Sequence, residues 1–444
     1  MGLIELSRLV VSGAVFVLGR LLLLLLVLLG GGAQITGGGA MAVMTTMAGR
    51  KKDNKATRPG PAIPLAPSPL PPSGAMRDGA EIVRQLKGLT RSGMRGGGGG
   101  PGGGGSRLRF VKRVELEGEL WEPEGIVRLA GGHGGEDEES ERFWVSAGEY
   151  TVPTKRFPGG KWRHGTDRSA GAGFAHLVVF DGTGRRLADW VVSEEGDLEY
   201  HNGGLDYDGR HIWATLSQYR PNTTGTVVRI DPARLTMKAV LRVSDHQGGI
   251  VHDAETGTLT TLNWGGRTAR RWDLGARRRA RGGMRVRAGQ GDDHGDQARL
   301  GGVEAGGRGE GEEGEGFDEP ERTIANPSYW VDYQDCKSLG RVGGRSLMLC
   351  SGIASPAPGV EVGGLAVVDT ETMVPVWEAP FMERTGARSG GGGGGGGDRG
   401  KGGGEGVLMT KNPMDVALVG GRARLYFAPE EGRSAVYVYE VCEG

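Results

Sequence analysis

The chain has 444 residues, of which 87 are glycine, and its 54 basic and 54 acidic residues give a formal net charge of zero. This balance excludes a global electric field that would favour nucleic acid or an anionic membrane surface. Much of the glycine lies in unbroken runs, which cannot bury enough apolar surface to offset the entropy of ordering. Without residues 1–105, about 275–322 and about 385–406, roughly 270 residues remain, enough for one large domain with a real core.

The N-terminal segment has the layout of a secretory signal peptide. Arg20 precedes a nine-residue apolar core at 21–29, and small residues that offer two cleavage sites follow. A transmembrane anchor needs about 20 apolar residues, a length that residues 9–29 reach only by including Arg20. We therefore expect residues 1–42 to be a cleaved signal and the protein to be secreted or in the secretory pathway. The alternatives are an uncleaved membrane anchor, an organelle transit peptide, or no targeting.

Residues 43–105 are rich in proline, glycine and basic residues, so we expect a disordered linker. From residue 106 the pattern changes to short alternating or continuous apolar runs bounded by Gly, Asp and Pro, which is typical of strands. Several of these runs close with aspartate: HLVVFD at 176–181, VVRID at 227–231, ARRWD at 269–273 and GLAVVD at 364–369.

These runs form five units of up to four antiparallel strands, which predicts an all-β chain folded as a five-bladed β-propeller over residues 106–444. A sixth blade would need strands hidden in the low-complexity inserts at about 275–322 and 385–406. The unit that begins near residue 246 loses its fourth strand into the first insert. The last unit also lacks a fourth strand, and a spare strand at 111–118 is able to complete it and close the ring.

One motif occurs twice, as HNGGLDYDG at 201–209 and HQGGIVHDA at 246–254. In both places it stands just before the first, innermost strand of a blade, where paired glycines let backbones approach closely. Equivalent positions of the other blades also carry polar residues. The resulting ring at one end of the central channel comprises Glu122, His201, His246, Asn326 and Asn412.

Two histidines and a carboxylate suggest chemistry at this ring. His201 and His246 are the candidate catalytic residues, as a general base or as metal ligands, and with Glu122 they form a candidate metal set. Imidazole favours zinc, iron or copper over calcium. The cofactor is therefore unknown, with a divalent metal as the candidate. A ligand site without metal and a purely structural polar plug are the alternatives.

Further channel-mouth candidates lie along or next to the innermost strands: Glu124, Asp206, His252 and Asp332. Strand alternation points some of them into the channel and others into packing, so a structural role is the competing interpretation. No GxSxG, Walker, HExxH or paired CxxC motif occurs. Two classes of function therefore remain: an exported hydrolase or lyase, and a non-catalytic binding or scaffold propeller.

The expected partner is an unidentified small molecule or protein ligand, and we expect no nucleic acid. A membrane would be contacted only through an uncleaved N-terminal segment, and we expect a monomer. Cys336 and Cys350 flank a hairpin whose pairing about Gly343 places them opposite one another. We expect buried thiols that pack as small apolar residues, with a disulfide as the alternative. Asn222-Thr223-Thr224 is a glycosylation sequon in a predicted loop, consistent with export.

Three blocks carry a family resemblance: residues 201–232, residues 245–267, and YWVDYQDCKSLG at 329–340 with the later MLCSG and MTKNPMDV. They resemble the domain of unknown function 6454 family, which is seen in secreted bacterial and eukaryotic proteins. The resemblance covers about 115–441; it implies a propeller-like fold and supplies no activity.

A looser resemblance involves the segment EPEGI, residues 122–126. It is similar to the first inner strand of gluconolactonase-type and strictosidine-synthase-like propellers, some of which bind calcium there. His201 and His246 stand where those metal sites have Asn and Asp, so the resemblance does not imply calcium here.

Overall fold

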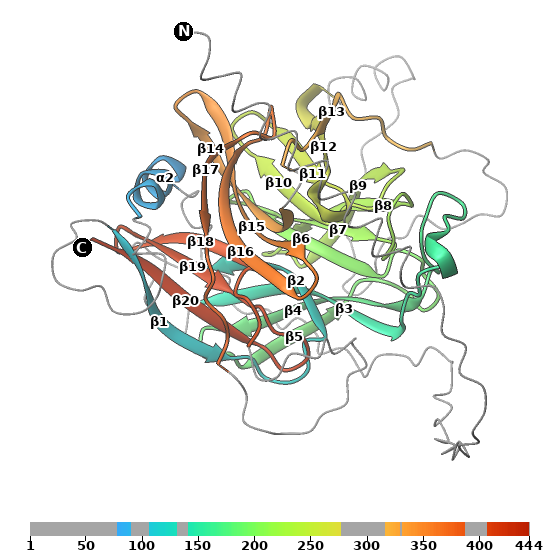
Figure 1. Cartoon of the computed structure of the whole chain (residues 1–444), viewed down its shortest axis with the longest axis horizontal. Coiled ribbons are helices and arrows are strands. Elements are labelled where there is room, and N and C mark those ends of the chain that lie inside the picture. The colour runs from blue at the N-terminus through green and yellow to red at the C-terminus, as the bar shows by residue number, and fades with distance from the viewer. Residues whose placement is uncertain are drawn as a thin grey trace, which may run out of the picture. The chain divides into compact units, whose positions relative to one another are not determined.

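Five four-stranded antiparallel sheets account for the strands of the computed structural model (Figure 1). The structure describes these residues: 78–89, 106–130, 141–276, 316–328, 331–386 and 406–443. Every described residue lies in one compact unit, within residues 54–444. The predicted signal or anchor at 1–42 therefore lies outside the described residues. Within the described part of the chain, no helix is long and apolar enough to span a membrane.

Each sheet is one blade, with its strands in chain order from the inside outward, except the last. The first blade comprises β2 (Glu122–Leu129), β3 (Arg142–Val152), β4 (Ala172–Asp181) and β5 (Arg186–Val191). The second comprises β6 (His201–Tyr207), β7 (Ile212–Ser217), β8 (Gly225–Asp231) and β9 (Thr236–Val243). The fourth comprises β14 (Asp332–Val342), β15 (Arg345–Ala357), β16 (Val360–Asp369) and β17 (Pro375–Pro380).

The fourth strands of the third and fifth blades come from distant parts of the chain. The third comprises β10 (Gly249–Asp253), β11 (Thr258–Leu262), β12 (Thr268–Asp273) and β13 (Arg322–Ala325). Its fourth strand thus follows the insert and is not lost in it. The fifth comprises β18 (Met414–Val419), β19 (Arg422–Phe427), β20 (Ala435–Cys442) and β1 (Arg107–Glu115). β1 pairs antiparallel with β20, which confirms the predicted closure of the ring by an N-terminal strand.

The innermost strands β2, β6, β10, β14 and β18 contact one another in a closed cycle, so the fold is a five-bladed β-propeller, as predicted. The core lies between neighbouring sheets. Five clusters of buried apolar side chains each fill one interface between adjacent blades. Trp144, Trp213 and Trp272 are among the largest fully buried side chains, and burial of one large apolar side chain stabilises the fold by roughly 1.5–3 kcal/mol.

A helix interrupts the segment predicted as linker. α2 (Gly79–Lys87) begins after Asp78, whose Oδ1 accepts a hydrogen bond from the amide of Glu81 at 3.0 Å. Its side chains Ile82 and Leu86 are fully buried in the apolar cluster between the fourth and fifth blades. Residues 79–87 are therefore part of the folded unit, in contrast to the expectation of disorder across 43–105. The remaining linker residues, apart from 88–89 and the cap at Asp78, lie outside the described part.

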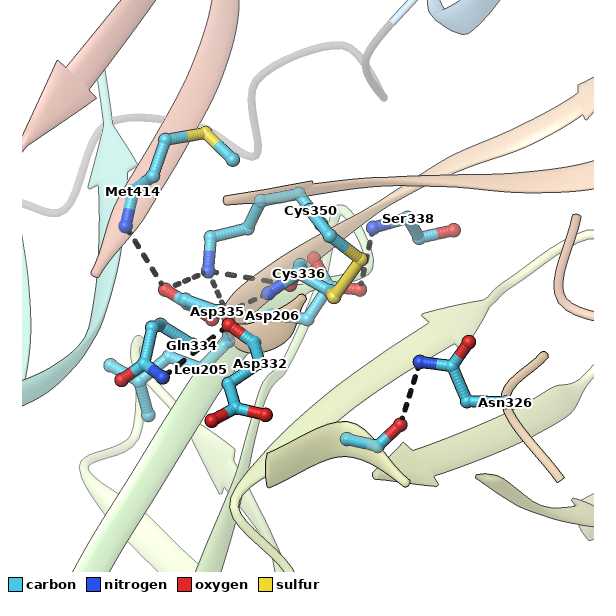
Figure 2. Close-up of a disulfide and its surroundings, with 12 residues drawn as sticks. Leu205, Asp206, Asn326, Asp332, Gln334, Asp335, Cys336, Ser338, Cys350 and Met414 are labelled. Atoms are coloured by element: carbon cyan, nitrogen blue, oxygen red, sulfur yellow. Dashed lines mark hydrogen bonds and ion pairs between the residues drawn. A yellow bond between two sulfur atoms is a disulfide. The ribbon is translucent and has the colours of Figure 1, made fainter. Parts of the chain in front are cut away.

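Cys336 and Cys350 form a disulfide across β14 and β15, where they are directly paired (Figure 2). The expectation of two separate thiols was wrong. The reason is the register, because pairing about the turn places the two side chains opposite one another on one face of the hairpin. The third cysteine, Cys442, is free and buried.

Candidate active site at the mouth of the channel

Glu122 and His201 are the first residues of the innermost strands β2 and β6, and His246 stands shortly before β10. The imidazole rings of His201 and His246 face one another, with 5.1 Å between centroids and 31° between planes. Both side chains are buried, with 2% and 3% of their surface exposed. The structure thus brings together the two histidines of the repeated motif, as the sequence predicts.

The two copies of the motif are also joined through their backbones. The amide of Gly204 donates to the carbonyl oxygen of Gly248 at 2.7 Å. A Cβ atom at Gly203 would lie 2.5 Å from Oγ1 of Thr215 and 2.8 Å from that same carbonyl oxygen. Glycine is therefore required at 203 by close approach, which is the reason that we gave for the motif.

The Nδ1 atoms of both histidines are already engaged. Nδ1 of His246 lies 2.8 Å from the carbonyl oxygen of Gln218, which can only accept, so this nitrogen carries the proton. Nδ1 of His201 lies 2.9 Å from the hydroxyl of Tyr150. Neither Nε2 atom has a hydrogen-bond partner among the described residues, so both are left to act on a bound molecule.

Burial keeps both histidines neutral. It lowers the pKa of His246 to about 4, an effect that the Gln218 carbonyl opposes and that the Arg168 guanidinium reinforces. Burial, and then the neighbouring His246, hold the pKa of His201 well below its usual range. With Nδ1 protonated, Nε2 of His246 carries an unprotonated lone pair at neutral pH.

Glu122 has the opposite perturbation. Burial raises its pKa to about 7, against the lowering effect of hydrogen bonds from Tyr150 and Tyr219. The hydroxyl of Tyr219 donates to Oε1 of Glu122 at 3.2 Å. Because Tyr150 lowers the pKa of Glu122 and bonds to His201, this phenol lies near both the carboxyl group and the imidazole.

Glu124 completes the acidic side of the site. Burial, and then the nearby Glu122 and Asp335, raise its pKa well above the usual range. Both Glu122 and Glu124 nevertheless keep part of their surface accessible to solvent. The site therefore contains carboxyl groups that protein surrounds but that solvent can still reach.

Aromatic side chains frame the histidines. Tyr150 and Tyr219 stack with centroids 4.6 Å apart, and Trp264 lies 5.4 Å from Tyr219 and 4.8 Å from His246. The guanidinium of Arg168 lies over the Trp264 ring, 4.5 Å from its centroid. Tyr150, Tyr219, Trp264 and Arg168 are all partly exposed, so this frame forms the solvent-facing side of the site.

These three aromatic residues were not predicted, although the sequence carries a signal for them. In each blade, the first residue of the innermost strand pairs with one residue of the second strand. The aromatic residue lies two positions after that partner in the chain. These pairs are Glu122 with Gly148, His201 with Ser217, and Gly249 with Leu262. The endings GEY, SQY and LNW are thus equivalent in three blades. Only the strand register, which the sequence does not fix, reveals that they reach the histidines.

Two predicted ring members point elsewhere. Nδ2 of Asn326 donates to the carbonyl oxygen of Gly266 at 2.9 Å, and Nδ2 of Asn412 donates to that of Pro429 at 2.9 Å (for Asn326, Figure 2). Asn326 also accepts from the amide of Ser328 at 2.9 Å. Both residues precede a proline, and both side chains hydrogen-bond to the backbone next to the first strand of their blade. They do not join the histidines.

Three further candidates have structural partners. Asp332 is partly exposed and forms an ion pair with Arg267. Asp206 is buried and accepts a hydrogen bond from the backbone amide of His252 at 3.0 Å, linking β6 to β10. Nδ1 of His252 lies 2.9 Å from Oδ2 of Asp208. These contacts favour the structural interpretation that we had set beside the functional one for these residues.

A fully buried ion pair lies among the innermost strands. Nζ of Lys337 lies 2.6 Å from Oδ2 of Asp335 and donates to the carbonyl oxygen of Leu205 at 2.6 Å. Oδ2 of Asp335 also accepts from the amides of Ile126 and Met414, the latter at 3.3 Å (for Met414, Figure 2). Three innermost strands thus share one carboxylate, which acts as a polar plug on the axis.

A metal ion has no prepared site here. Among the described residues, no group of three or more His, Cys, Asp or Glu side chains is placed to hold one. The two histidines offer only their Nε2 atoms, since both Nδ1 atoms are engaged, and the hydroxyl of Tyr219 donates to Glu122. The arrangement of His201, His246 and Glu122 therefore does not fit the predicted metal set, and we derive no step through a metal.

Comparison with known proteins places the chain beside one family. The profile of a family of unknown function (DUF6454) matches residues 163–286 and 315–390. The chain resembles this family. The match confirms the resemblance seen in the sequence, and it supplies no activity. No functionally curated protein matches the chain.

Solved structures that are similar share little sequence. A tail fiber of Staphylococcus aureus phage P68 has 8% identity and a TM-score of 0.35, over 76% of this chain and 53% of that chain. A hypothetical protein from Leishmania major has 8% identity and a TM-score of 0.36, over 75% and 90%. A calcium-binding protein, regucalcin, from Agrobacterium tumefaciens has 10% identity and a TM-score of 0.33, over 76% and 96%. The chain thus spans about half the length of the phage protein, and we draw no functional argument from these scores.

Proposed function

We propose that the protein is an exported hydrolase or lyase that performs general acid–base chemistry at the mouth of its channel. The observation that carries this proposal is the pair of facing imidazoles, whose Nδ1 atoms are engaged and whose Nε2 atoms are unpartnered among the described residues, beside a partly accessible carboxyl group. In a purely structural site, these nitrogens would instead be hydrogen-bonded within the protein, as the side-chain amides of Asn326 and Asn412 are.

The directions of the pKa shifts support one division of roles. A histidine that stays neutral offers Nε2 as a base at neutral pH, and a glutamic acid with a pKa of about 7 still holds a proton to donate. Environments that push two titratable groups in opposite directions are characteristic of acid–base pairs. His201 or His246 would take a proton from water or from a carbon acid, and Glu122 would protonate the leaving group.

Tyr150 keeps His201 in the useful tautomer. Once Glu122 has given up its proton it only accepts, so in that state the Tyr150 hydroxyl donates to it and accepts from Nδ1–H of His201. Nε2 of His201 is then unprotonated. The same phenol gives a path by which a proton taken up at the imidazole can pass to the carboxylate and restore the acid.

Substitutions that mimic one ring nitrogen test the proposal. Asparagine reproduces the position of Nδ1 and removes Nε2, so His201→Asn and His246→Asn should fold with the bonds to Tyr150 and Gln218 retained. In a screen of ester, lactone and polysaccharide substrates, we expect each variant and Glu122→Gln to lower the rate by about 10²–10⁴-fold. The matched control is His211→Gln, which alters a histidine outside the site. Equal turnover by all four variants would refute the catalytic role.

The second candidate function is a non-catalytic binding propeller. The buried Asp335–Lys337 pair supports it, because polar groups among the innermost strands there have a structural use. A ligand that binds with unchanged affinity in Glu122→Gln and in both asparagine variants, together with no turnover in the screen, would support this alternative.

Export is part of the proposal. Asn222 of the sequon is exposed, in the loop between β7 and β8, and the Cys336–Cys350 disulfide suits an oxidising compartment. We expect a mature chain that begins near Gln34 or Val43 and loses mass on enzymatic deglycosylation. An unprocessed, unglycosylated chain in the cytosol of the native host would contradict this.

A further inference from the structure

His176 is a buried histidine of the first blade that is not part of the candidate site. It stands on β4, and only 1% of its surface is exposed. Nδ1 lies 2.8 Å from Oδ1 of Asp189 on β5, and Nε2 lies 3.3 Å from Oε2 of Glu149 on β3. Because carboxylates only accept, both contacts are hydrogen bonds only when both ring nitrogens carry a proton. The surroundings of His176 are therefore those of an imidazolium ion.

The two carboxylates stabilise the charge on His176. Burial alone would lower the pKa of His176, but the hydrogen bonds to Asp189 and Glu149 outweigh burial and raise the pKa above its ordinary value of 6.5. Asp189 has a second cation nearby, because Nη1 of Arg186 lies 3.4 Å from its Oδ2. Among the described residues, His176 is the only ion-pair partner of Glu149. The contact with Glu149 therefore depends most on the charge of the ring.

Three residues that contact His176 adjoin residues of the candidate site. The ring of Trp121 stacks on the imidazole, with 3.9 Å between centroids and 28° between planes. Nδ2 of Asn202 donates to the carbonyl oxygen of His176 at 2.7 Å. In the chain, Trp121 precedes Glu122, Glu149 precedes Tyr150, and Asn202 follows His201. Successive side chains of a strand point to opposite faces, so His176 contacts the side of β3 opposite to Tyr150.

The backbone at Trp121 depends on this support. Its φ of 53° lies in the left-handed region, which is costly for a bulky residue and persists only where the surroundings hold it. The amide of Gly432 donates to the Trp121 carbonyl oxygen at 2.6 Å, and the stack on His176 holds the ring. An aromatic face attracts a cation, so this stack is stronger when the imidazole is protonated. The next residue in the chain, Glu122, begins β2 from this fixed point.

We propose that His176, as an imidazolium ion, is a positioning residue that holds Glu122, Tyr150 and His201 in place from the opposite face of the first blade. The purpose of this positioning rests on the proposed function. Loss of the proton leaves one N–H for two carboxylates, and the longer contact, with Glu149, is lost first. The side chain of Glu149 is 22% exposed, so it then turns to solvent and shifts Tyr150, whose hydroxyl bonds to His201. The contact is complete below pH 6.5 and is lost as the pH rises through the raised pKa of His176.

Proton–nitrogen correlation NMR of the ring signals tests this coupling without a substrate. The titration uses the full-length Glu122→Gln variant, because Glu122, with a pKa of about 7, would otherwise add its own transition. We expect His176 to titrate above pH 6.5 and the His201 signal to shift with the same midpoint. Adding Glu149→Gln should lower both midpoints together by roughly one pH unit, since it removes one of the two charges beside the ring. Glu194→Gln, at an exposed carboxylate in the loop after β5, is the matched control and should move neither midpoint.

A second comparison separates positioning from packing. His176→Gln keeps an N–H donor for Glu149 at every pH, so His201 should keep its low-pH signal throughout the titration. His176→Leu fills similar space without a donor and should give the high-pH signal throughout. Identical His201 signals in these two variants would overturn the proposal.

The Glu149→Gln titration decides the question if His176→Leu shows no native thermal transition. A His201 signal that stays constant while His176 titrates, or midpoints that separate in Glu149→Gln, would also overturn the proposal. Turnover is not measured in these titrations. Failure of the catalytic proposal would therefore leave the coupled shifts in place, and absence of the coupling would leave the effect of His201→Asn on turnover unchanged.

Discussion

His246 illustrates how one buried side chain links the site to stability. Its folded-state pKa is lowered from the ordinary value of 6.5 to about 4, so the unfolded chain binds a proton more readily in this interval. The stabilisation is complete above pH 6.5 and is lost as the pH falls toward 4. Glu122, with its raised pKa, contributes in the opposite direction between pH 4.5 and 7.

We predict that His246→Asn flattens this dependence. Between pH 7 and pH 4, the wild-type protein should lose on the order of 3 kcal/mol more unfolding free energy than the variant, from a shift of roughly two pH units. Urea unfolding of both proteins at four pH values measures this difference in unfolding free energy. The Glu122 contribution is present in both proteins and cancels in the difference. Parallel curves for the two proteins would show that His246 is not neutral in the fold.

Asp335 and Lys337 make a second prediction about buried charge. Both side chains are fully buried and pair at 2.6 Å. Lys337→Met leaves the carboxylate without its cation and should destabilise the fold by about 3–5 kcal/mol. The double variant Asp335→Asn, Lys337→Met should recover much of this loss, because the charge is removed with its partner. Equal stability of the single and double variants, measured by urea unfolding, would contradict the account of the plug.

Most strands, but not every element, could be predicted from sequence patterns alone. Alternating apolar runs that end in aspartate predicted the strands and the blade order, because register and burial impose a period of two. β13 was missed because it has four residues, none of them buried, after a long insert. α2 was missed because low-complexity sequence surrounds its single buried face. The histidines and Glu122 were predicted from their repeat, whereas Tyr150, Tyr219 and Trp264 depend on pairing between strands.

The docking of α2 predicts that a residue in the supposed linker stabilises the propeller. Ile82 is fully buried against the fourth and fifth blades, so Ile82→Ala should cost about 2–4 kcal/mol. Arg84 lies on the exposed face of the same helix, with 64% of its side chain accessible, and Arg84→Ala should change stability by less than about 0.5 kcal/mol. Identical melting temperatures for both variants would mean that the helix does not dock in solution.

The whole molecule depends on closure between its two ends. β1 completes the fifth blade by pairing with β20 from Arg107 to Glu115, and it buries Leu108 and Val114. A protein that begins at Gly118 would expose the edge of β20 and open the ring. We predict loss of the cooperative urea transition and association on size-exclusion chromatography. Phe110→Ala, at an exposed position of the same strand, is the control; a truncated protein with a native transition would contradict closure by β1.

The proposed acid–base site requires two neutral imidazoles with available Nε2 atoms at the channel mouth. Long-range proton–nitrogen correlation NMR across a pH titration reads both the tautomer and the pKa of each of the eight histidines, with the asparagine variants assigning the two signals. We predict that His246 titrates near pH 4 as the Nδ1–H tautomer and that the pKa of His201 lies well below its usual range. Titration of either ring near pH 6.5, or protonated Nε2 atoms at pH 7, would contradict the acid–base site.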